Sequence, residues 1–138
     1  GHVALRVGGK IDDVHGPTLS IEGRVRTLHN GSYEETERRH GGGRLFNQGL
    51  TAVVDVHGKG LLVLNSSRSS PNSIHQITCV GIQPSQQKIL VAKGAVAPRA
   101  AYEPVCARLI EVASGGATAI FRLPKDYAWA RKTLYEWQ

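Results

Sequence analysis

The chain has 138 residues, of which 41% are hydrophobic and 20% charged, and its formal net charge is +6. This composition is typical of one globular domain that buries a core without disulfides or metals. It argues against nucleic-acid binding, because only 6% of the residues are aromatic and the basic residues are scattered. No apolar run reaches the ~18 residues needed to span a bilayer. We therefore expect a single domain over residues 1–138 in the cytoplasm, without a signal peptide or membrane association.

The first third of the chain alternates apolar and polar residues, as strands with one solvated face do. The pattern predicts strands over residues 2–7 and 19–27. Asn30-Gly31 predicts a hairpin turn into a return strand over 32–36, because both residues tolerate positive φ. The charged, glycine-rich stretch 37–48 predicts a flexible loop.

The middle of the chain is more apolar. The runs 50–56 and 60–64 flank His57-Gly58-Lys59 and predict a second hairpin, centrally placed in the sheet. Pro71 predicts the start of a helix that runs to about Val80, and Gly81 is a natural end for it.

The last third mixes short elements of both kinds. Residues 88–92, 110–113 and 118–123 predict strands, and residues 100–109 predict a helix that must accommodate Pro104 in its first turn or kink there. The aromatic residues of 126–138 predict a terminus that docks on another surface. Together the elements predict an α+β fold, a mostly antiparallel sheet of about seven or eight strands with two or three helices.

A first candidate ligand site follows the first strand, at Gly8-Gly9-Lys10. Backbone N–H groups and the Lys10 ammonium could hold an anion, although the spacing is not that of a P-loop. Asp13 and His15, two positions apart, could ligate one metal ion or form an acid/base pair. Their spacing alone favours a capped turn with solvated charges, because Asp-x-His is common by chance.

Two further candidates are cationic. Arg68, in a serine-rich loop after an apolar run, could hold a carboxylate or phosphate, or could simply pin its own loop. Lys93 and Arg99 flank a loop of small residues that could cradle a ligand, or Arg99 could pair with Glu103 as an i,i+4 neighbour. The two cysteines, Cys79 and Cys106, form no metal-binding pair, and neither an HExxH nor a GxSxG motif occurs.

Several of these segments occur in a specific order. Residues 3–12 precede His15-Gly16-Pro17, the run 51–56 precedes Ser67-Arg68, and residues 88–94 precede 97–104. The ordered set, from Val3 to the end of the chain, resembles the C-terminal domain of the microcystinase C-like (MlrC-like) zinc metallopeptidases. The chain departs from that pattern at Ala97-Pro98, near which some members have a histidine, and at Ser114-Gly115-Gly116, where a Pro-Gly turn is usual.

The resemblance implies a zinc-dependent hydrolase of small or linearised cyclic peptides, with its zinc in a preceding N-terminal domain that is absent from this chain. No zinc ligand carries over to these residues, so we expect no metal or cofactor here and no catalytic residue is assigned. Six residues match motif positions, and the hypothesis is that they gather at one rim facing the other domain: Lys10, Asp13, His15, Arg68, Lys93 and Arg99.

Three functions follow from these patterns. The first is an accessory domain that shapes the substrate site of its own N-terminal catalytic domain, is inactive alone and meets the peptide substrate there. The alternative is a stand-alone module that binds an anion or small ligand. The third is an independent metal hydrolase, which needs Asp13, His15 and another ligand around one ion. Bare edge strands would also favour a homodimer.

Overall fold

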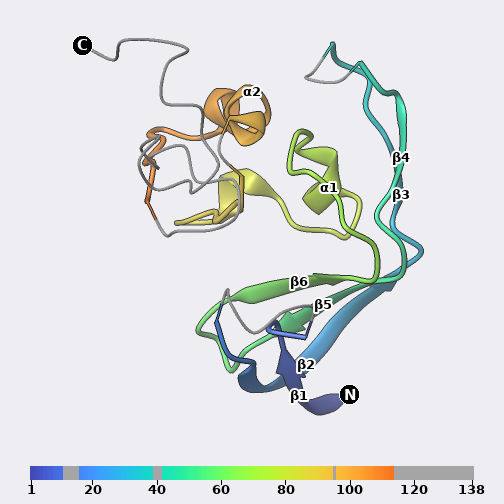
Figure 1. Cartoon of the computed structure of the whole chain (residues 1–138), viewed down its shortest axis with the longest axis vertical. Helices are drawn as coiled ribbons and strands as arrows, with labels where there is room; N and C mark the ends of the chain where they lie inside the picture. Colours follow the sequence, from blue (N-terminus) through green and yellow to red (C-terminus); the bar gives the residue numbers. More distant parts are fainter. Residues whose placement is uncertain (11–15, 39–41, 95, 114–138) are drawn as a thin grey trace, which may run out of the picture.

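The computed structural model describes residues 1–10, 16–38, 42–94 and 96–113. Its strands form two antiparallel sheets (Figure 1). The four-stranded sheet has the order β1-β2-β5-β6, with β1 (His2–Val7), β2 (Leu19–His29), β5 (Thr51–Asp55) and β6 (Leu61–Asn65). The two-stranded sheet pairs β3 (Ser32–Glu34) with β4 (Leu45–Asn47).

Helical structure is short in the described part of the chain. It consists of α1 (His75–Thr78), α2 (Ala97–Tyr102) and the 3₁₀ turns η1 (Pro84–Gln86) and η2 (Glu103–Val105). The predicted α+β fold, with about seven or eight strands and two or three helices, is therefore wrong, because the described residues form six strands in two sheets, a small, mostly β fold. None of the described helices has the length and apolar character needed to cross a bilayer.

Both predicted helices are shorter in the structure, and they begin or end at other residues than predicted. The helix expected over 71–80 is reduced to α1, which ends at Thr78 and is followed by a turn that includes Gly81, with φ 83°. The helix expected over 100–109 begins earlier, with Pro98 in its first turn, and gives way to a 3₁₀ turn at Glu103 and Pro104. The strands expected over 88–92 and 110–113 do not form, because neither segment pairs with a strand. Residues 118–123 and 126–138 lie outside the described residues.

One long, kinked hairpin links the two sheets. β2 and β3 follow each other along one arm, and β4 and β5 along the other, with Glu34 opposite Leu45 and His29 opposite Thr51. Asn30-Gly31 is therefore not a hairpin turn: its predicted return strand pairs with β4 instead of β2. The loop predicted over 37–48 is likewise wrong at residues 45–47, which form β4.

Two glycines allow the kink. Gly31 has φ 78° and Gly49 has φ 72°, both in the left-handed region. A Cβ on Gly31 would lie 1.9 Å from the carbonyl oxygen of Gly49, so the two arms approach as closely as only glycine permits. The Gln48 N–H still donates to the Gly31 carbonyl, at 3.0 Å, and keeps the hairpin continuous.

The predicted strands over 2–7 and 19–27 and the predicted hairpin around His57-Gly58-Lys59 are confirmed. β5 lies in the middle of the sheet as expected, whereas β6 is an edge strand. The core lies between β5–β6 and the segment of α1 and its C-terminal turn, which pack on one face of the sheet (Figure 1). Its buried members are Val53, Val80 and Ile82, with Leu61, Val63, Ile77 and Cys79 packed against them.

Candidate functional site

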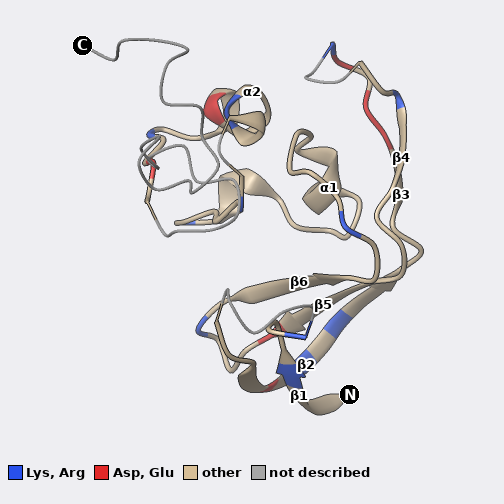
Figure 2. Ribbon diagram, viewed as in Figure 1, with Lys and Arg blue, Asp and Glu red and all other residues tan. Residues whose placement is uncertain are grey.

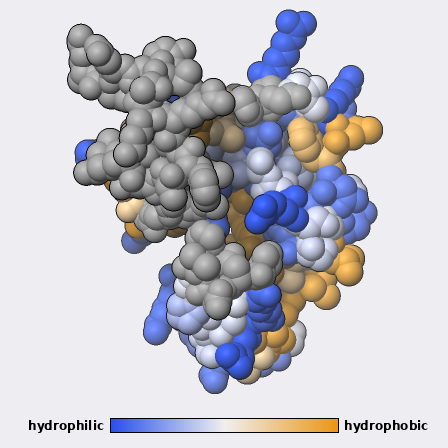
Figure 3. All heavy atoms as spheres, in the orientation of Figure 1, coloured by the Kyte–Doolittle hydropathy of each residue, from blue (hydrophilic) through white to orange (hydrophobic). Residues whose placement is uncertain are grey.

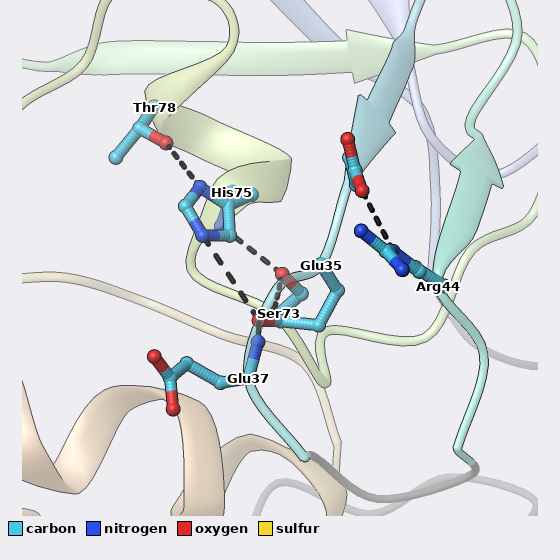
Figure 4. A network of polar contacts seen from close by, with 7 residues as sticks. Glu35, Glu37, Arg44, Ser73, His75 and Thr78 are labelled. Atoms are coloured by element: carbon cyan, nitrogen blue, oxygen red, sulfur yellow. Dashed lines mark hydrogen bonds and ion pairs between the residues drawn. The ribbon is translucent and has the colours of Figure 1, made fainter.

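The most connected polar cluster lies where the chain leaves β3 and meets α1. Glu35, directly after β3, is only 3% exposed. Its Oε2 accepts a hydrogen bond from Ser73 Oγ at 2.5 Å, and its Oε1 accepts one from the Glu37 backbone N–H at 2.8 Å. His75 Nε2 lies 4.0 Å from the same Oε1 (Figure 4). A carboxylate this deeply buried is tolerated because its oxygens are hydrogen-bonded.

The cluster contains serine, histidine and glutamate, but it lacks the connections of a nucleophilic triad. In a triad the imidazole accepts the serine proton and the carboxylate orients the imidazole. Here Ser73 donates directly to Glu35 and accepts from the His75 backbone N–H at 3.2 Å, while the His75 Nδ1 lies 3.3 Å from Thr78 Oγ1 (Figure 4). Ser73 is also only 1% exposed, so substrate does not reach it. The cluster therefore has a structural role. It joins α1 to the two-stranded sheet of β3 and β4, which we call the ribbon.

A second set of buried hydrogen bonds involves Gln48, whose side chain is fully buried at the kink of the hairpin. Its Nε2 donates to the Gln76 carbonyl at 3.1 Å, and its Oε1 accepts from Asn65 Nδ2 at 3.1 Å. Gln48 thus joins the hairpin to α1 and to the end of β6. Together, the Glu35 and Gln48 contacts fix the two-stranded ribbon relative to the rest of the chain.

The ribbon carries an open, mostly apolar hollow of about 420 Å³, lined by Ser32, Tyr33, Leu45, Phe46 and Asn47. The rings of Tyr33 and Phe46 stack with centroids 5.4 Å apart. The Tyr33 hydroxyl is buried and, among the described residues, makes no hydrogen bond of acceptable geometry. Burial raises the pKa of Tyr33 above its ordinary value, and the nearby Ser69 side chain lowers that pKa by less.

The structure places the predicted site residues as follows. Lys10, Arg68, Lys93 and Arg99 are exposed, and Asp13 and His15 lie outside the described residues. Lys and Arg are spread over strands and loops and do not gather in one place (Figure 2). Helix α2, which contains Arg99, and strand β1, which precedes Lys10, lie toward opposite ends of the long axis (Figure 1). That the six residues share one rim stays a prediction.

Two of the predicted segments do meet. A Cβ on Gly94 would lie 2.9 Å from Pro98 Cγ and 3.3 Å from Pro71 Cγ, so the loop after Lys93 packs against the loop after Arg68. Arg99 itself is engaged, because its guanidinium bonds Glu111 at 2.5 Å and Glu103 at 3.3 Å. The hydrogen bond to Glu111 is the main cause of the raised pKa of Arg99. The predicted i,i+4 pair of Arg99 with Glu103 is therefore confirmed.

Sequence reasoning missed Glu35, Gln48 and Tyr33. Ser73 and His75 belong to no catalytic motif, since neither an HExxH nor a GxSxG sequence occurs in the chain. Their partner Glu35 is 38 positions from Ser73, beyond the range of any local spacing rule. In the described part of the chain, no three His, Cys, Asp or Glu side chains come together in a way that could hold a metal ion. These residues therefore do not fit a zinc site.

The model of one family, described as the MlrC C-terminus, matches residues 1–123. No curated protein and no solved structure matches the chain. The match covers most of the chain and includes the Gly-Gly-Lys, Arg68 and Lys93 to Glu103 segments described above. The chain therefore belongs to the family of MlrC C-terminal domains.

Proposed function

We propose that this chain is the accessory domain of an MlrC-like zinc metallopeptidase, in which it shapes the substrate site formed with the preceding domain. Membership of a family defined by the C-terminal part of MlrC is the observation that carries the proposal. The zinc and the hydrolysis belong to the preceding domain, and the substrates are small or linearised cyclic peptides. The chain is inactive alone.

The buried hydrogen bonds of Glu35 and Gln48 support this role. The Glu35 and Gln48 contacts hold the ribbon, α1 and the end of β6 in one fixed arrangement. Side chains on a fixed scaffold orient a substrate with little loss of conformational entropy on binding. The chain's part in the reaction is therefore to bind and orient the peptide.

The meeting of the Arg68 and Lys93 loops favours a second candidate, a module that binds an anion without catalysis. The contact of Gly94 with Pro71 brings two cation-bearing loops together, and both cations are exposed. Arg99 contributes less than expected to such a site, because two carboxylates already pair with it. In the first proposal the same loops would contact a carboxylate of the peptide.

The test is hydrolysis of a short linear peptide carrying a fluorophore and a quencher, in the presence of zinc. We expect the full-length polypeptide to cleave it, this chain alone not to cleave it, and the preceding domain alone to have a much lower kcat/KM. Adding this chain to the preceding domain should restore part of the loss. Equal kcat/KM with and without this chain would contradict the accessory role and leave the anion-binding module as the better description.

A further inference from the structure

The four-stranded sheet has a second face, opposite the one that packs on α1. Successive residues of a strand point to opposite faces, so Val53 contacts the α1 segment while Val54 and Ala52 point away from it. The strand register extends this second face across the sheet. We call it the outer strand face; it comprises Val3, Leu5, Val7, Leu19, Ile21, Gly23, Val25, Leu28, Ala52, Val54, Leu62 and Leu64.

A bulge in β2 is what keeps this face apolar along its whole length. Val25 lies opposite Val54 and Thr27 lies opposite Val53, so Arg26 is an extra residue in β2. The bulge shifts the alternation by one position and moves Leu28 onto the outer strand face, opposite Ala52. Without it, the apolar side chains of the two halves of β2 would lie on different faces.

The outer strand face contains no charged residue, and it is only partly covered. Val54 and Ile21 in its middle are 0% and 7% exposed, whereas Leu19 and Leu28 are 62% and 77% exposed. Figure 3 shows hydrophobic side chains along the right-hand edge of the molecule, over strands of both sheets. In contrast, the other face of the β1–β2 pair is polar and solvated, with Arg6, Glu22 and Arg24 exposed. An uncharged apolar surface of this kind is typical of a permanent interface.

The position of the first residue indicates which partner covers this face. The Gly1 carbonyl accepts a hydrogen bond from the Val25 N–H at 3.0 Å and so continues the antiparallel pairing of β1 with β2. A chain segment preceding β1 would therefore follow the edge of the sheet toward Leu28, whose side chain lies on the outer strand face. Members of this family form the C-terminal part of a longer polypeptide. A second copy is disfavoured because both copies would have a net charge of +6.

We infer that the outer strand face is the surface against which the preceding domain of the same polypeptide packs. The inference rests on the proposed accessory role, and it adds the surface through which that role is exerted. The contact is apolar and lies on the strands, whereas the loops with Arg68 and Lys93 stay free to meet substrate.

Thiol reactivity tests the inference without relying on activity. Leu28→Cys places a thiol on the outer strand face, and Glu22→Cys places one on the polar face of the same strand. Both positions are exposed, so the thiol is accessible at either one in this chain. Each variant is made in this chain and in the full-length polypeptide, and alkylation by a maleimide is followed at each cysteine by peptide mass spectrometry. Leu19→Cys serves as a second probe of the face.

We expect Leu28→Cys to react rapidly in this chain and on the order of tenfold or more slowly in the full-length polypeptide, where reaction requires local opening. Glu22→Cys should react at similar rates in both. Cys79, which packs against the core, reports that each variant is folded, because it should react much faster in urea.

Three results would overturn the inference. Equal rates for Leu28→Cys in the two proteins would show that the preceding domain does not cover this face. Protection in this chain that grows with protein concentration would assign the face to a second copy, and protection independent of concentration would assign it to another segment of this chain. Loss of peptidase activity is not among these results, so the accessory role and the docking face fail separately.

Discussion

The carboxylate of Glu35 and the hydroxyl of Ser73 lie 2.5 Å apart, although 38 positions separate the two residues. Both residues are at most 3% exposed. Their contact joins the end of β3 to the turn that precedes α1. Removing the Ser73 hydroxyl would take one hydrogen bond from the buried Glu35 carboxylate, which keeps the one from the Glu37 N–H.

Ser73→Ala should therefore lower the free energy of unfolding. The variant removes a hydrogen bond to a buried carboxylate, a loss that costs about 1–3 kcal/mol. Urea unfolding followed by circular dichroism measures the change. Ser70→Ala is the matched control, since Ser70 is exposed and its contact to Asn72 is made by its backbone carbonyl. Similar free energies of unfolding for Ser73→Ala and the unsubstituted chain would show that the hydrogen bond between Ser73 and Glu35 does not stabilise the fold.

Gly31→Ala should be far more damaging than Gly58→Ala. The two glycines have nearly the same φ, 78° and 71°, so the backbone strain of adding a Cβ is comparable. Only at Gly31 does the Cβ collide with backbone, 1.9 Å from the Gly49 oxygen, whereas nothing lies within 4 Å of a Cβ on Gly58. Gly58→Ala should cost ~1 kcal/mol, and Gly31→Ala should exceed the ~3 kcal/mol that bounds most single substitutions. Equal losses of stability for the two variants in thermal unfolding would mean that the backbone around Gly31 and Gly49 can shift to accommodate the Cβ at little cost.

Tyr33→Phe should stabilise the chain at neutral pH. The substitution keeps the ring stacked on Phe46 and removes a buried hydroxyl that lacks a hydrogen-bond partner among the described residues. An unsatisfied buried polar group costs ~1 kcal/mol or more, so a gain of that order is expected in urea unfolding. Tyr33→Leu, which also loses the stacking, should be less stable than Tyr33→Phe. A loss of stability in Tyr33→Phe would indicate that the hydroxyl has a partner, such as an ordered water.

Alkaline pH should weaken the fold through its buried tyrosines. Burial raises the pKa of Tyr102 and of Tyr33 above the ordinary tyrosine value of 10.0, because the phenolate is poorly solvated inside the protein. Above about pH 10 the unfolded chain loses these protons before the folded chain does, so the folded state binds more protons and its stability falls as pH rises. Well below pH 10 both tyrosines are protonated in the folded and the unfolded chain, so their contribution to the free energy of unfolding does not change with pH. Urea unfolding from pH 8 to 11 should show a smaller decline for Tyr102→Phe, and an unchanged decline would contradict the assignment.

Local alternation predicted much of the four-stranded sheet. The predictions were correct for the strands at 2–7 and 19–27 and for the hairpin at His57-Gly58. Both signals, the alternation of apolar and polar residues and a short turn that contains glycine, act over only a few residues. The same reasoning failed at Asn30-Gly31, where the residues suit a turn and the structure uses them for a kink. It failed again at 88–92 and 110–113, where strand-forming residues lack a partner strand.

The candidate site was less predictable. Family resemblance correctly identified the chain as an MlrC C-terminal domain, and the pairing of Arg99 with Glu103 followed from helical spacing. Glu35 gave no signal, because a glutamate in a charged run is ordinarily solvated. Its burial depends on Ser73 and on the Glu37 backbone, and only the packing of α1 against the ribbon brings Ser73 there.

The sequence by itself determined which side chains share a face in β1 and in β2 as far as Val25, since neighbouring side chains of a strand point to opposite sides. The bulge at Arg26, which moves Leu28 to the outer strand face, became visible only in the structure. The sequence also determined where glycine permits positive φ, and the family to which the chain belongs. The tertiary structure decided which strands pair, because the long hairpin is closed by contacts between distant residues such as Glu34 with Leu45 and His29 with Thr51. It decided the burial of Glu35 and the exposure of Leu28 for the same reason: both depend on what packs against a residue, which local spacing does not encode.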